Sequence, residues 1–137
     1  MRTITTYSVY EYLKGKFPTL EPYLKNGTID RKTERSIGVF LGSETRSVRN
    51  IAVGGLECTT VRMLPVNILV HWTENQQVCD EKATEIFDAI LCEKSNFIVG
   101  KVKIAMIELL DGCPMQTGRD EKNVCESTIR ANFYYYV

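Results

Sequence analysis

The clearest pattern of apolar and polar positions lies in the middle of the chain. Five apolar residues there recur at spacings of four, three, one and three, which places them on one helical face: Cys79, Ala83, Ile86, Phe87 and Ile90. The opposite side of such a helix carries charged residues: Asp80, Glu81, Lys82, Glu85 and Asp88. Thr73 and Gln76 are spaced as a capping box. The pattern predicts a helix over residues 75–93 that buries one face in a core.

Alternation with a period of two predicts the last strand. Over residues 126–137 four apolar positions, Ile129, Ala131, Phe133 and Tyr135, alternate with Arg130, Asn132, Tyr134 and Tyr136. The first set is expected in the core and the second on a wet, aromatic face. Further strands are expected over 36–41, 59–72 and 102–110, where β-branched and apolar residues gather. Pro65 cannot donate to a ladder, so the early part of the 59–72 strand is expected at an edge or a bulge.

A short helix is expected near the N-terminus. Ser8 and Glu11 have capping-box spacing, and Gly15 and Pro18 are typical of the end of a helix. Between the predicted elements lie polar connections at 18–35, 42–50 and 111–123, and a bend at Gly54-Gly55.

The order helix, strand, strand, long helix, strand, strand predicts an α+β fold. We expect a mostly antiparallel sheet with the long helix and the short N-terminal helix packed on one face. No repeat or linker divides the chain, so residues 1–137 are expected to form a single domain. Apolar residues make up 44% and charged residues 25% of the chain, the balance of a folded protein.

Charge and hydropathy narrow the choice of partners. Lys plus Arg and Asp plus Glu both number 17, so the chain lacks the basic surplus typical of nucleic-acid binding, and no sequence-specific nucleic-acid role is expected. No apolar run approaches the roughly 20 residues that span a bilayer, and the N-terminus has no signal-peptide core. We therefore expect no membrane partner and an intracellular folding site, with reduced thiols at Cys58, Cys79, Cys92, Cys113 and Cys125.

The search for chemistry gives no catalytic, cofactor-binding or metal site. The cysteines form no C-x2-C pair, although Cys113 and Cys125 bracket a loop and could approach each other. His71 is the single histidine and has no nucleophile motif beside it, so a half-buried residue with a local hydrogen bond is the expected outcome. Gly54-Gly55 lacks the lysine of a phosphate loop. The chain is therefore expected to be no enzyme and to need no cofactor.

Two loops and the C-terminal rings remain as candidate contacts with other chains. The first loop contains Arg46 and Arg49, and the second contains Arg119 and Asp120. Both loops are read equally well as solvated connections. Tyr134 and Tyr136 are expected on the outward face of the last strand, and tyrosine is enriched in interfaces.

Several segments together resemble a protein family. They are Val53-Gly-Gly-Leu-Glu-Cys58, the strand Leu64–Trp72, the capped helix Asn75–Cys92, Gly118-Arg-Asp120 and the ending Ile129–Tyr136. With the order of elements, they resemble minor capsid and tail-terminator-like (head-tail joining) proteins of long-tailed bacteriophages. The resemblance implies a non-catalytic virion subunit that forms a ring, expected to be a hexamer. That ring caps the tail tube, and its partners are the tail tube protein and the head connector protein.

Two other functions stay open at this point. One is another component of the head–tail neck, which would share the fold and differ in its partner. The other is a small ligand-binding or enzymatic domain centred on His71, which a deep pocket containing that residue would favour.

Overall fold

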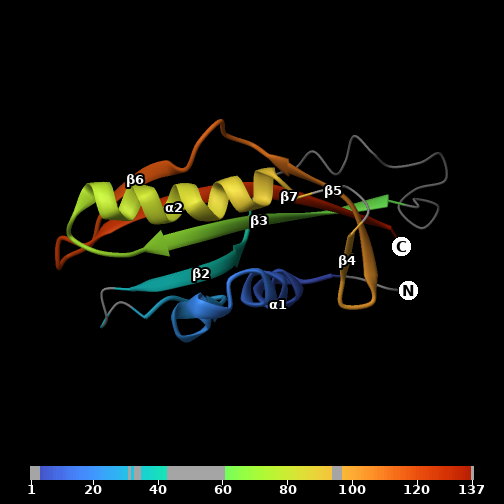
Figure 1. The fold of residues 1–137 in the computed structure, drawn as a ribbon, viewed down its shortest axis with the longest axis horizontal. Coiled ribbons are helices and arrows are strands. Elements are labelled where there is room, and N and C mark those ends of the chain that lie inside the picture. Colours follow the sequence, from blue (N-terminus) through green and yellow to red (C-terminus); the bar gives the residue numbers. More distant parts are fainter. Residues whose placement is uncertain (1–3, 31, 33–34, 43–60, 94–96, 137) are drawn as a thin grey trace.

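A computed structural model describes residues 4–30, 32, 35–42, 61–93 and 97–136 of the chain. The described residues form two α-helices, one 3-10 helix and seven strands (Figure 1). In chain order these are α1 (Thr6–Lys16), η1 (Pro18–Tyr23), β1 (Leu24–Asn26), β2 (Ser36–Leu41), β3 (Val61–His71), α2 (Gln76–Leu91), β4 (Phe97–Val99), β5 (Val102–Leu109), β6 (Met115–Arg119) and β7 (Cys125–Tyr136).

The strands make one curled sheet in the order β1-β2-β3-β7-β5-β4, and β6 pairs with the first part of β7. Every pairing is antiparallel except that of β1 with β2. The expected α+β class with a mostly antiparallel sheet is confirmed. The two longest strands, β3 and β7, run side by side over their whole length, from Val61 opposite Tyr136 to His71 opposite Glu126.

Both helices pack on the same face of the sheet. The ring of Tyr12 in α1 lies 6.1 Å from that of Phe133, and the thiol of Cys79 in α2 donates to the carbonyl of Cys125 at 3.2 Å. Phe133 and Cys125 point to one side of β7, because residues two apart on a strand share a face. Figure 1 shows α2 running along β3 and β7. The core between helices and sheet includes all five residues of the predicted α2 stripe, each no more than 6% exposed: Cys79, Ala83, Ile86, Phe87 and Ile90.

The predicted N-terminal caps of both helices are wrong by two or three residues. α1 begins at Thr6, and Ser8 lies inside it, where its hydroxyl accepts a hydrogen bond from the Thr5 amide at 3.1 Å. α2 is capped by Asn75 rather than Thr73. The Asn75 side chain accepts from the amides of Gln77 and Val78. The side-chain oxygen of asparagine caps the free amides of a helix as well as a hydroxyl does. The Thr73 to Gln76 spacing and Asn75 therefore both indicated a cap, and the spacing was the weaker indication.

Three short strands lie outside the strands predicted from the sequence, and two of them, β1 and β6, lie in predicted connections. They are β1, β4 and β6, of three to five residues each. β6 is exposed along its whole length and is held by its backbone ladder to β7. Such strands bury too few side chains to leave a period-two pattern.

The prediction for Pro65 is confirmed in the described part of the chain. The β2 ladder ends at Leu41 opposite Val66, one residue after Pro65 along β3. Pro65 itself lies opposite Asn132 of β7, and its carbonyl accepts from the Gly42 amide. Pro65, which has no amide hydrogen to donate, therefore lies in β3 just beyond the residues that pair with β2.

Candidate functional site

His71 is sealed inside the fold rather than half-buried as predicted. Its side chain is 0% exposed, and its Nε2 lies 2.7 Å from Oδ2 of Asp120, whose side chain is 7% exposed. The partner comes from the turn between β6 and β7, so the hydrogen bond is not local in sequence. Among the described residues, no hydrogen bond reaches Nδ1 of His71. The imidazole is therefore enclosed by the fold.

Asp120 organises the turn as well as binding the histidine. Its Oδ1 accepts from the amides of Lys122 and Val124, both at 2.9 Å. Its own amide donates to the Val124 carbonyl, and Asn123 adopts a left-handed φ of 66° between them. Asn tolerates that conformation better than most residues. The hydrogen bond from His71, followed by that from the Val124 amide, holds the pKa of Asp120 below its usual value.

Arg119 fastens the same turn to the start of α2. Its guanidinium donates to the carbonyls of Glu74 and Asn123, at 2.9 and 2.8 Å. Arg119 and Asp120 were predicted together as contacts with another chain. Both residues make hydrogen bonds within this chain, and Arg119 is in addition exposed at the surface. The partner contact of this loop stays a prediction, while Arg46 and Arg49 of the other loop lie outside the described residues.

The described cysteines are free thiols. Cys125 is buried opposite Arg119, and Cys113 is exposed beyond the far end of β6, so the two do not approach each other. Cys79 is the buried neighbour of Cys125, and burial raises the pKa of the Cys79 thiol. Within the described part of the chain, no three His, Cys, Asp or Glu side chains gather to hold a metal ion.

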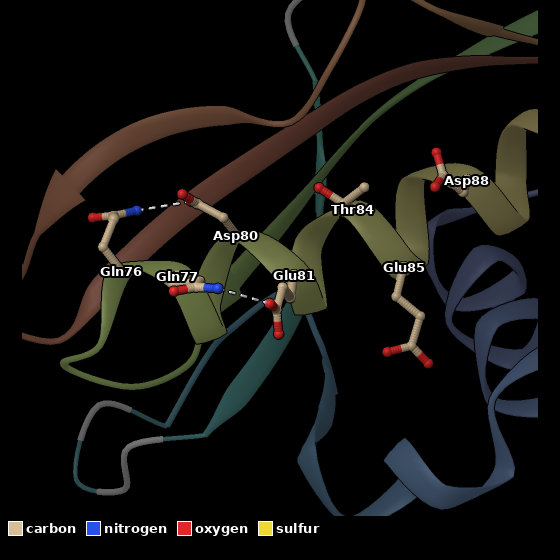
Figure 2. Close-up of a pocket in the computed structure, with 7 residues that line it drawn as sticks. All are labelled: Gln76, Gln77, Asp80, Glu81, Thr84, Glu85 and Asp88. Carbon is tan, nitrogen blue, oxygen red and sulfur yellow. Dashed lines mark hydrogen bonds between the residues drawn. The ribbon is translucent and has the colours of Figure 1, made fainter.

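The outer face of α2 forms a shallow acidic surface. A hollow of about 680 Å³ lies over this face (Figure 2). Seven side chains line it: Gln76, Gln77, Asp80, Glu81, Thr84, Glu85 and Asp88. Gln76 and Gln77 donate to Asp80 and Glu81, one turn further on, and Lys82 pairs with Glu85 at 2.8 Å. Among the described residues, none forms an ion pair with Glu81 or Asp88. This surface therefore carries a net negative charge.

The two predicted contact tyrosines belong to a larger patch on the other face of the sheet. Tyr134 and Tyr136 point away from the helices, because their neighbours Phe133 and Tyr135 are in the core. The register places Met106 opposite Tyr134 and Ile98 opposite Lys103, and the Lys103 ammonium lies 5.6 Å from the Tyr136 ring. We call this set the outer patch: Ile98, Lys103, Met106, Tyr134 and Tyr136.

The outer patch is apolar and open to solvent. Ile98 is 70% exposed, Met106 45% and Tyr136 40%. Tyr134 is half-buried and donates to Glu108, which also accepts from the Asn132 amide. Asn132 was expected on a wet face and is instead 0% exposed. Sequence reasoning found the tyrosines and missed Ile98, Lys103 and Met106, because only the sheet order brings three strands together here.

A second hollow, of about 590 Å³, lies between α1 and β4. At its base one carboxylate oxygen of Glu93 accepts from the Tyr12 hydroxyl and the Lys16 ammonium, both at 2.6 Å. Burial and the hydrogen bond to Glu93 raise the pKa of Tyr12, so the phenol stays protonated. The three groups satisfy one another, which is the behaviour of a structural link between helices.

No protein-family model matches the chain, and comparison with curated proteins gives no match. Among the described residues, no helix is long and apolar enough to cross a membrane.

Proposed function

We propose that this chain is a non-enzymatic structural subunit of a long-tailed phage virion, a tail terminator or minor capsid protein whose ring caps the tail tube and joins it to the head connector. One observation carries the non-enzymatic part. The single histidine is fully buried and its Nε2 is bound to Asp120, so the group best suited to acid–base chemistry is used to hold a turn.

The surfaces support a protein that works through contacts with other chains. The outer patch exposes three large apolar side chains, and clusters of this kind are typical of interaction sites. The acidic face of α2 lies on the opposite side of the sheet and offers a second, different surface. The specific assignment to phage tails comes from the sequence resemblance described above.

Electron microscopy tests the proposal directly. The purified full-length protein is mixed with polymerising tail-tube subunits from the same phage or prophage. We expect tubes that acquire a cap at one end and stop lengthening. Tubes that neither bind the protein nor change in length would refute the terminator role.

A neck component other than the terminator is the second candidate, and the same surfaces favour it equally. It would bind the assembled head connector and leave tube length unchanged. An enzyme or ligand-binding domain centred on His71 finds less support, because His71 lines neither of the two surface hollows described above.

A further inference from the structure

The two surfaces of this chain differ in chemistry and in position. The outer patch is apolar and carries the ammonium of Lys103. The outer face of α2 is acidic. The same helix also carries two exposed apolar residues, Val78 and Leu91, which are 38% and 62% exposed. The patch lies on the face of the sheet that the helices leave uncovered, and α2 lies on the other. One molecule can therefore use both surfaces at once.

We propose that the outer patch of one copy docks on the acidic face of α2 of the next copy. The inference rests on the proposed ring and names the two surfaces that build it. Unlike surfaces on opposite sides of a molecule make a heterologous, head-to-tail contact, and such contacts close into a ring when the rotation between copies allows it.

Charge complementarity selects a second copy as the occupant. Glu81 and Asp88 have no cationic partner among the described residues, while Lys103 is exposed beside apolar side chains. An ammonium placed on the α2 face would neutralise part of its negative charge. Ile98 and Met106 would be removed from water if they packed against the exposed Val78 or Leu91 of α2. The chain as a whole has 17 basic and 17 acidic residues, so copies are not driven apart by net charge.

Zero-length cross-linking tests the contact. A carbodiimide joins a lysine amine to a carboxylate that touches it. Equal amounts of unlabelled and 15N-labelled full-length protein are treated, both free at high concentration and bound to tubes, and the peptides are identified by mass spectrometry. We expect mixed-isotope cross-links from Lys103 to Glu81, Glu85 or Asp88. Cross-links between copies that join only other surfaces would overturn the pairing.

Charge reversal supplies a second readout. Lys103→Glu alone and the double variant Glu85→Lys/Asp88→Lys alone should each weaken association at least about tenfold, because each places like charges across the contact. A mixture of the two variants should associate again, since each then meets a complementary surface on the other. Circular dichroism checks that both variants are folded. If the double variant associates as well as the wild type, the α2 face is not the partner.

The two proposals can fail separately. Capped tubes with cross-links elsewhere would refute the pairing and leave the terminator role intact. The expected cross-links without capping would support the pairing and refute the terminator role. If the protein neither caps tubes nor cross-links to itself, both proposals are wrong.

Discussion

Asp120 shows how much one side chain can do in this fold. One of its oxygens is hydrogen-bonded to the buried His71, and the other accepts hydrogen bonds from two backbone amides of the β6–β7 turn. A carboxylate that accepts several hydrogen bonds is favoured in its ionised form. The same residue therefore shapes the turn and ties it to the end of β3.

Removing the charge of Asp120 should destabilise the protein. Asp120→Asn keeps the shape of the side chain but weakens a charge-assisted hydrogen bond to a buried ring, and we expect a loss of about 1–3 kcal/mol in the free energy of unfolding. Urea titration measures it. Asp111→Asn is the matched control, because Asp111 pairs with Arg130 at the surface and should cost at most about 1 kcal/mol. If both variants lose the same amount of unfolding free energy, the burial of His71 does not strengthen its hydrogen bond with Asp120.

The contribution of Asp120 should also depend on pH. Its pKa is lowered in the folded protein, so the stabilisation is fully present above the unfolded value of about 3.9 and is lost as pH falls through the lower folded pKa. The difference in unfolding free energy between wild type and Asp120→Asn should be constant from neutral pH to about pH 4 and shrink below it. A difference that instead disappears between pH 7 and pH 5 would contradict this assignment.

At the scale of elements, two substitutions distinguish the cap seen in the structure, Asn75, from the cap predicted from the sequence, Thr73. Asn75→Ala removes an oxygen that accepts from the Gln77 and Val78 amides, and should cost about 1 kcal/mol of stability. Thr73→Ala is the control, since the Thr73 hydroxyl makes only a 3.3 Å contact with the Asn75 carbonyl. Thermal unfolding of both variants compares them. A larger loss for Thr73→Ala would restore the cap predicted from sequence.

Packing around β2 can be tested with a pair of glycines. A Cβ at Gly38 would lie 2.4 Å from a methyl of Ile29 and 2.7 Å from the Thr28 carbonyl, so Gly38→Ala should destabilise by about 1–3 kcal/mol. At Gly15, in α1, a Cβ meets nothing within 4 Å. Gly15→Ala should therefore stabilise by about 0.5–1 kcal/mol, because alanine is the better helix former. In denaturant titrations, the free energy of unfolding should fall for Gly38→Ala and rise for Gly15→Ala.

Strong periodicity explains which elements could be predicted. β7 was placed to within a residue, because buried residues alternate with less buried ones over most of its twelve positions. β2 was found without such alternation, as a short run of mostly apolar residues whose first four positions are all buried. β1, β4 and β6 left no such pattern. The alternation also says which face a side chain takes and not what covers that face, so Asn132 was wrongly expected in water. The contact of His71 with Asp120 joins two distant segments and has no local signature.

On the scale of the whole molecule, one layer of helices covers one face of a curled sheet, and part of the other face stays apolar at the surface. The outer patch draws its residues from β4 and β5, which follow each other in the chain, and from β7, which is distant in the chain and adjacent to β5 in the sheet. The residues that stabilise the fold are thereby separated in space from the candidate contact residues. The core lies between helices and sheet, and the candidate contacts lie outside it.

A substitution in the outer patch should affect assembly and leave folding intact. Ile98→Thr keeps a β-branched residue in β4, and because Ile98 is 70% exposed, the free energy of unfolding should change by no more than about 0.5 kcal/mol. If the patch makes the contact between copies, tube capping seen by electron microscopy should fall sharply, since an apolar side chain is lost from the interface. Leu41→Thr is the matched control, with Leu41 66% exposed and outside both surfaces. Capping that survives Ile98→Thr and fails with Leu41→Thr would move the contact to the β2 end of the sheet.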